Sequence, residues 1–174
     1  MKYLIVVDMQ KDFVDGSLGS ERAQAIVEKV CQRIEEYKTS GGRIYATLDT
    51  HFENYLDTAE GRKLPVKHCI KNTDGWMLDE RVSSALVDSA KLVEKLTFGS
   101  VALAQELADK LNEGDEVELC GLCTDICVVT NALLIKAYVP ETKIIVRADC
   151  CAGVTEESHK AALKTMQACQ IEVI

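Results

Sequence analysis

The chain has 174 residues, with 28 acidic against 20 basic side chains and a formal net charge of -8. Its length is typical of one folded domain, and we expect a single domain over residues 1–174. The acidic balance argues against nonspecific nucleic-acid binding, which needs a basic surface. No apolar run approaches the roughly 18 residues that would span a membrane, and the apolar N-terminal run is too short for a signal peptide. We therefore expect a cytoplasmic protein.

Apolar, strand-like runs alternate along the chain with segments of helical periodicity. The expected strands occupy residues 3–7, 43–48, 91–93, 116–120, 143–146 and 171–173. The expected helices occupy residues 21–38, 78–87, 101–111, 125–138 and 156–169. Six strands separated by helices predict an α/β fold: a three-layer, doubly wound parallel sheet with helices on both faces. Residues 50–76 lack clear periodicity, which is typical of a functional excursion.

Four chemically useful side chains follow different expected strands. They are Asp8, Asp49, Lys95 and Cys127. Ligands of doubly wound sheets bind outside the carboxyl ends of the strands. The sequence therefore places these four residues on one rim of the sheet.

The segment Gly121-Leu-Cys-Thr-Asp-Ile-Cys-Val128 puts Cys127 between an apolar strand and the opening turn of a helix. The positive end of a helix dipole favours a thiolate, and the unpaired N–H groups there are able to bind an oxyanion. Asp8 is the expected proton acceptor, and Lys95 is expected to stabilise the thiolate or to tune the carboxylate. Partial desolvation beside Lys95 would bring the pKa of Asp8 closer to that of a useful base.

A second cluster has the composition of a metal site. Asp49 and His51 alternate, so in an extended segment both side chains point to the same side, and His68 follows seventeen residues later. Oxygen and nitrogen ligands of this kind suit Zn²⁺, Fe²⁺ or Mn²⁺. Glu60, in the intervening loop, is a candidate fourth ligand.

Other conspicuous residues have ordinary interpretations. The eight cysteines are expected to be mostly reduced in a cytoplasmic chain of this size. Cys31 and Cys169 fall on apolar helix faces and are interpreted as core residues. His159 lies among polar residues and is expected to be solvated, and Asp149 is expected to hydrogen-bond a nearby loop.

Five segments, in this order, resemble the nicotinamidase and pyrazinamidase branch of the isochorismatase-like cysteine hydrolases. They are Val6-Val-Asp-Met-Gln-Lys-Asp-Phe13, Asp49-Thr-His51, Leu64-Pro-Val-Lys-His-Cys69, Lys95-Leu-Thr-Phe98 and Gly121–Val128. The resemblance implies an Asp8–Lys95–Cys127 triad. It also implies a cis Leu122–Cys123 peptide, with the backbone N–H groups of Cys123 and Cys127 as the oxyanion hole.

The same resemblance implies a metal, most simply Zn²⁺, held by Asp49, His51 and His68, with Glu60 matching a ligand of some members. The implied reaction is hydrolysis of nicotinamide to nicotinate and ammonia through a Cys127 thioester, with the pyridine nitrogen bound to the metal.

The resemblance also suggests roles at the edge of this site. Phe13 and Phe98 are candidates to pack against the ring, where ordinary core packing is the alternative. Val66 stands where members often carry an aromatic residue, and Trp76 is interpreted as structural. Isochorismate-cleaving members generally lack the nucleophile, so Cys127 argues against that activity. Members are often homo-oligomers, although no residue here specifies an interface.

Three alternatives remain open from the sequence. In the first, the chain is a cysteine amidohydrolase that acts on another small amide or carbamoyl compound. In the second it is a thiol redox protein that uses the C-x-x-C pair Cys120 and Cys123, which would make Cys127 a spectator. In the third it is a metal-bearing binding module without catalysis.

Overall fold

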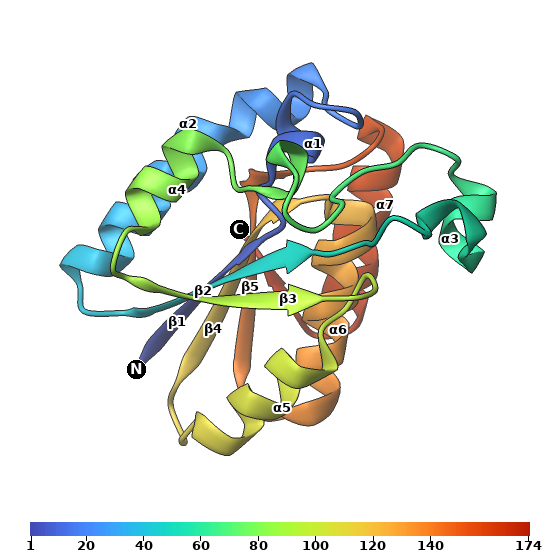
Figure 1. Ribbon diagram of the computed structural model, residues 1–174. Coiled ribbons are helices and arrows are strands. Elements are labelled where there is room, and N and C mark those ends of the chain that lie inside the picture. Colours follow the sequence, from blue (N-terminus) through green and yellow to red (C-terminus); the bar gives the residue numbers. More distant parts are fainter.

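The computed structural model describes residues 1–174, and its centre is a sheet of six strands. All neighbouring strands are parallel, in the order β3-β2-β1-β4-β5-β6 (Figure 1). The strands are β1 (Lys2–Val7), β2 (Arg43–Asp49), β3 (Ala90–Lys95), β4 (Glu116–Leu122), β5 (Lys143–Ala152) and β6 (Glu172–Val173). The expected doubly wound parallel sheet is confirmed.

Helices cover both faces of the sheet. In Figure 1, α2 and α4 lie together on one face, and α5, α6 and α7 lie together on the other. The helices are α1 (Lys11–Val14), α2 (Glu21–Thr39), α3 (Ala59–Lys63), α4 (Glu80–Leu86), α5 (Val101–Lys110), α6 (Val129–Tyr138) and α7 (Glu156–Ala168). None of the helices is both long and apolar enough to cross a membrane.

The local sequence accounts for these elements. In β1 every residue after Lys2 is buried, as expected for a central strand covered on both faces. Helix α2 begins after Ser20, whose side chain accepts a hydrogen bond from the N–H of Ala23. Its buried positions recur at helical spacing along one face: Ala23, Ile26, Val27, Val30, Ile34 and Tyr37.

The order of the strands creates a crevice between β1 and β4. From β1 the chain continues to β2 on one side, whereas from β4 it continues to β5 on the other. Such a switch point is the usual ligand site of this class of sheet. Val7 lies opposite Gly121 across the two strands, and Gly121 has a φ of 117°. A Cβ at Gly121 would lie 2.2 Å from the carbonyl oxygen of Val7, so only glycine allows the strands to approach this closely.

Several element boundaries differ from the sequence expectations. The expected helix over residues 125–138 is divided into a π-helical turn, η3 (Thr124–Val128), and the regular helix α6. Residues 50–76 are not wholly irregular, because they contain α3 and two 3-10 turns, η1 (Tyr55–Asp57) and η2 (Asp74–Trp76). The short helix α1 was not expected from the sequence at all.

The fifth strand is much longer than expected, because its second half continues to pair with β4 beyond an irregularity in the ladder. Asp149 therefore lies within β5 and does not hold a loop: its exposed carboxylate is 3.5 Å from Lys29. Cys169 is also corrected, because it is an exposed residue at the end of α7 and not part of the core. Cys31 is partly buried and does pack against the core.

Candidate active site

Lys95 lies at the centre of the site, at the last position of β3, and its side chain is 1% exposed. Its Nζ atom lies 2.7 Å from Asp8 Oδ2 and 2.9 Å from Asp49 Oδ1, and it donates a 3.5 Å hydrogen bond to Cys127 Sγ. Burial alone would lower the pKa of Lys95, but the nearby acidic groups outweigh burial and raise it. The lysine therefore keeps its proton and supplies a fixed positive charge to the thiol and to both carboxylates.

Asp8 is fully buried directly after β1, in a left-handed backbone conformation with a φ of 47°. Its Oδ1 atom accepts a 2.6 Å hydrogen bond from the hydroxyl of Thr47, whereas Oδ2 has no hydrogen bond of suitable geometry. Burial raises the pKa of Asp8, and Lys95 opposes this shift. The carboxylate is thus a stronger base than an exposed aspartate, and its Oδ2 atom faces the ammonium group of Lys95.

Cys127 is buried, with 5% of its surface exposed. Burial raises the pKa of Cys127 well above its ordinary value, and the negative charge of Asp8 raises it further, against the effect of Lys95. Burial therefore opposes the thiolate that a helix N-terminus would favour. A proton acceptor is needed before the sulfur can attack a substrate.

The turn that carries Cys127 is held by its own backbone and by a buried asparagine. The carbonyl oxygen of Cys123 accepts hydrogen bonds from Ile126 and Val128, and the Leu122–Cys123 peptide bond is cis, as the family resemblance implied. The side chain of Asn131 donates a 2.8 Å bond to the carbonyl of Cys127. Asn131 also bonds the backbone of residues 98 and 100, so the turn is tied to the loop that follows β3.

Asp49, His51, Glu60 and His68 converge next to this turn, with one potential ligand atom from each within 4.8 Å of all the others. Asp49 Oδ2 lies 3.0 Å from His51 Nε2 and 3.7 Å from His68 Nε2. Glu60 Oε1 lies 3.6 Å from His51 Nε2 and 3.7 Å from His68 Nε2. The four sequence candidates therefore form one cluster, which is a candidate site for a divalent metal.

Two observations show that these donors fit a metal. The buried Nε2 atom of His51 has no hydrogen-bond partner of suitable geometry, and the Nδ1 atom of His68 lies 2.9 Å from the carbonyl of Val66, which leaves Nε2 as the free ligand atom. A tetrahedral ion with bonds of about 2.0–2.2 Å separates its ligand atoms by roughly 3.3–3.6 Å, close to the distances found here.

Asp49 joins the metal cluster to the triad, because it presents one carboxylate oxygen to Lys95 and the other to the two histidines. Its backbone is fixed by the fully buried side chain of Gln10, which accepts from the N–H of Asp49 at 2.7 Å and donates to its carbonyl at 2.9 Å. A third hydrogen bond of the Gln10 side chain is donated to the carbonyl of Trp76. Trp76 itself donates to Thr50, which supports its structural role.

Sequence reasoning missed Thr47, Gln10 and Asn131, although each carries a visible signal. All three are buried polar residues, Thr47 and Asn131 lie in apolar runs, and buried polar groups need partners. Thr47 precedes Asp49 by two positions on β2, which places both on one face of the strand. Tyr55 was missed too, and its buried ring lies 4.6 Å from that of His51 and 5.0 Å from that of His68.

The two phenylalanines expected at the substrate differ in placement. The ring of Phe13 lies 5.4 Å from that of His68, so it lines the metal cluster. Phe98 is 41% exposed, and its backbone carbonyl is held by Asn131. Val66 is also partly exposed, on the segment that leads to His68.

Cys120 and Cys123, the C-x-x-C pair, form no disulfide in this structure. All eight cysteines are free thiols, and Cys120 is completely buried. Burial raises the pKa of Cys120 well above its ordinary value and that of Cys123 to about 12. Reactive disulfide pairs require an accessible thiolate, so these two thiols do not support the redox alternative.

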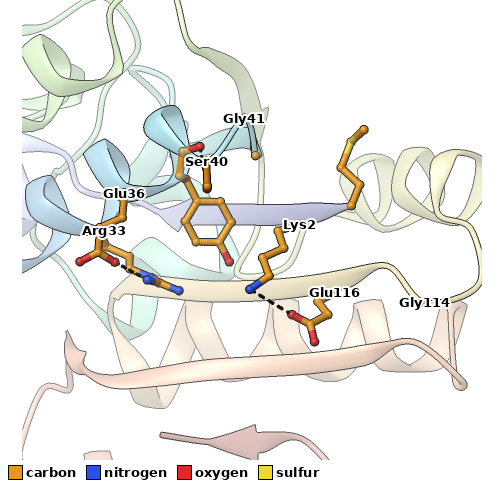
Figure 2. Close-up of a pocket in the computed structure, with 10 residues that line it drawn as sticks. Lys2, Arg33, Glu36, Ser40, Gly41, Gly114 and Glu116 are labelled. Atoms are coloured by element: carbon orange, nitrogen blue, oxygen red, sulfur yellow. Dashed lines mark hydrogen bonds and ion pairs between the residues drawn. The ribbon is translucent and has the colours of Figure 1, made fainter.

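A surface hollow of about 700 Å³ lies at the opposite end of the sheet, lined by ten residues that include Lys2, Arg33 and Glu36 (Figure 2). Its charged groups are already paired: Arg33 with Glu36 and the buried Glu118, and Lys2 with Glu116. The hollow offers no free nucleophile or base, so the reactive groups of the protein are concentrated at the carboxyl ends of the strands.

Comparison with known proteins agrees with this site. The isochorismatase domain matches residues 2–174. The chain belongs to the isochorismatase family. It is 31% identical over 172 residues to an uncharacterised isochorismatase family protein of Bacillus subtilis, covering 93% of this chain and 92% of the relative.

Solved structures of this family superimpose on the whole chain. A pyrazinamidase/nicotinamidase from Streptococcus mutans is 28% identical, with a TM-score of 0.86 and coverage of 100% of both chains. A pyrazinamidase of Pyrococcus horikoshii in complex with zinc is 29% identical, with a TM-score of 0.83, and the match covers 99% of this chain and 98% of that one. The similarity to a zinc complex supports a divalent metal at the cluster.

Proposed function

We propose that this isochorismatase-family protein is a metal-dependent cysteine amidohydrolase whose substrate is nicotinamide or a closely related pyridine carboxamide. The observation that carries the proposal is the position of Lys95, which contacts Asp8, Cys127 and the metal-cluster residue Asp49 at once. A nucleophile, a base and a substrate anchor are thereby held within one small volume. The pyrazinamidase and nicotinamidase names of the similar structures support the substrate class.

The geometry suggests how acylation proceeds. Asp8 Oδ2 takes the thiol proton, and Cys127 Sγ attacks the carboxamide carbon while Lys95 stabilises the developing thiolate. The oxyanion accepts hydrogen bonds from the backbone N–H groups of Cys123 and Cys127. The protonated Asp8 then gives its proton to the leaving amine, which releases ammonia and leaves a thioester on Cys127.

Deacylation uses the same carboxylate. Asp8 removes a proton from water as the water attacks the thioester carbon, and the proton returns to the sulfur of Cys127. Together, acylation and deacylation convert an amide and water into a carboxylate and ammonia. A divalent ion such as Zn²⁺ held by Asp49, His51 and His68, with Glu60 as a candidate further ligand, would bind the ring nitrogen and so orient the amide. Phe13 and Phe98 would contact the ring.

The test is ammonia release from nicotinamide by wild type, by Cys127→Ala and by a chelator-treated sample. Cys127→Ala is expected to lose roughly a thousandfold or more of kcat, because no other group replaces the nucleophile. Cys169→Ala, at an exposed thiol, is the matched control and should retain wild-type activity. Chelator should abolish turnover and added Zn²⁺ should restore it.

Benzamide distinguishes substrate anchoring from general amidase activity, because it lacks the ring nitrogen. Much faster turnover of nicotinamide than of benzamide is expected. A folded, zinc-loaded wild type that releases no ammonia from nicotinamide would contradict the substrate assignment, and other small amides or carbamoyl compounds would then be tested.

A further inference from the structure

His159 is not solvated as the sequence suggested. It lies in the first turns of α7, it is half-buried, and its Nδ1 atom is 2.8 Å from the hydroxyl of Thr124. Thr124 is completely buried and is the first residue of the π-helical turn that carries Cys127. A side chain distant in sequence thus contacts the nucleophile's turn directly.

The hydrogen-bond direction follows from the partners available. His159 Nδ1 is the side-chain hydrogen-bond partner of the buried Thr124 hydroxyl, and a neutral ring with its proton on Nε2 would accept the hydroxyl hydrogen. Burial lowers the pKa of His159, with Asp125, Glu156 and Lys160 as the charged groups around it. The neutral ring is therefore the form present near neutral pH.

The next residue of the turn is held from the same side. The carboxylate of Asp125 accepts hydrogen bonds of 3.1 and 3.3 Å from the backbone N–H of Val154, just before α7. A Cβ at Gly153 would lie 2.8 Å from the Cβ of His159 and 3.0 Å from Asp125 Oδ1, so the segment passes closely between them. Two consecutive residues of the turn are therefore fixed to the start of α7.

The start of α7 is itself well defined. Thr155 and Ser158 form a reciprocal capping box, and the N–H of His159 donates to the carbonyl of Thr155. The imidazole consequently extends from a fixed helix end and not from a mobile loop.

We propose that His159 is a positioning residue, which holds Thr124 and thereby sets the orientation of the Cys127 thiol and of the backbone N–H groups of Cys123 and Cys127. This inference rests on the proposed amidase function. His159 touches neither substrate nor metal in this scheme, and it acts only through the turn. Small displacements of such a turn have large effects on rate, because the reacting atoms must be aligned.

The test compares His159→Leu, which removes the hydrogen bond, with His159→Asn. The side-chain oxygen of asparagine stands at the same number of bonds from Cα as Nδ1 and also accepts a hydrogen bond. We expect His159→Leu to lower kcat for nicotinamide between about tenfold and a hundredfold with KM changed by less than about threefold. His159→Asn should recover most of kcat. Lys164→Leu, on the exposed face of the same helix, is the matched control and should behave as wild type.

A double-mutant cycle with Thr124→Val isolates the contact. Because both substitutions remove the same hydrogen bond, the double variant should be no slower than the slower single variant. Additive losses, or a His159→Leu protein with wild-type kcat, would overturn the proposal. A fall in Tm without a change in kcat would also overturn it, since that result indicates a purely structural role.

The alkylation rate of Cys127 by iodoacetamide, followed by mass spectrometry of its peptide, separates this inference from the proposed function. Failure of the function appears as a wild type without ammonia release. In that case the inference still predicts a changed alkylation rate in His159→Leu, recovered in His159→Asn, and an unchanged rate would refute it.

Discussion

At the scale of single residues, the site depends on how buried charges are balanced. Asp8, Asp49 and Lys95 are almost completely inaccessible to solvent, and two carboxylates share one ammonium group. Asp49 also faces the two histidines, whereas Asp8 faces only Lys95 and the hydroxyl of Thr47. The different surroundings are the reason that we propose a ligand role for Asp49 and a base role for Asp8.

Thr47 offers a direct test of Asp8 as the base. Its hydroxyl donates to Asp8 Oδ1 and so stabilises the ionised carboxylate. Thr47→Val should raise the pKa of Asp8, and the acid limb of the kcat profile should move to higher pH. One lost hydrogen bond to a charged group corresponds to about a tenfold loss of kcat at pH values below the new limb. Thr47→Ser, which keeps the hydroxyl, should leave the limb in place, and an identical profile in both variants would argue against Asp8.

At the scale of secondary-structure elements, strand β4 connects the turn that carries Cys127 to a buried ion-pair network. Its carboxyl end leads into the cis peptide and the π-helical turn of Cys127, and its middle contains the buried carboxylate of Glu118. Glu118 accepts two 2.6 Å hydrogen bonds from Arg33 of α2 and one of 2.9 Å from Arg147 of β5. This ion-pair network connects α2, β4 and β5.

Glu118→Gln should destabilise the protein by about 3 kcal/mol, because two arginines lose their counter-charge at a buried position. Burial opposes ionisation of Glu118, but the arginine hydrogen bonds outweigh it and lower its pKa below the ordinary value of 4.5. The ionised Glu118 therefore stabilises the fold fully above about pH 4.5, the ordinary pKa of a glutamate. This stabilisation is lost as the pH falls through the lower pKa that Glu118 has in the folded protein.

Chemical denaturation at several pH values checks this prediction. The difference in unfolding free energy between wild type and Glu118→Gln should be largest near neutral pH and should shrink in acid. Glu116→Gln, the same change on the same strand at a partly exposed carboxylate, should cost less than about 1 kcal/mol. Equal effects of the two substitutions would show that the buried network does not stabilise the fold.

At the scale of the whole molecule, the candidate metal cluster of Asp49, His51, Glu60 and His68 connects the sheet to the long segment between β2 and β3. Asp49 belongs to β2, whereas Glu60 and His68 belong to that segment. A ligand that binds only the folded state stabilises it by mass action, by about 2.7 kcal/mol at one hundred times its Kd. Zn²⁺ should therefore raise the Tm by roughly 5–10 °C.

Calorimetry with and without Zn²⁺ measures this effect. His68→Asn should abolish the shift, and His159→Asn, the same substitution outside the cluster, should retain it. A zinc-induced shift that survives in His68→Asn would place the ion elsewhere.

The sequence by itself determined the fold class and indicated the candidate reactive residues. Alternating apolar strands and amphipathic helices leave few topologies other than a doubly wound sheet, and Asp8, Asp49, Lys95 and Cys127 follow from their positions at strand ends. Five short segments in order were sufficient to indicate the family, which the match over residues 2–174 confirms. The roles of the individual residues stay predictions.

Only the tertiary structure decided the burial of the reactive residues and their supporting contacts. Burial raises the pKa of the Cys127 thiol, an effect that no local sequence pattern reports. The contact between His159 and Thr124 joins residues 35 positions apart. Local sequence sets which element each residue occupies, whereas packing between elements sets the solvent exposure and the partners on which its chemistry depends.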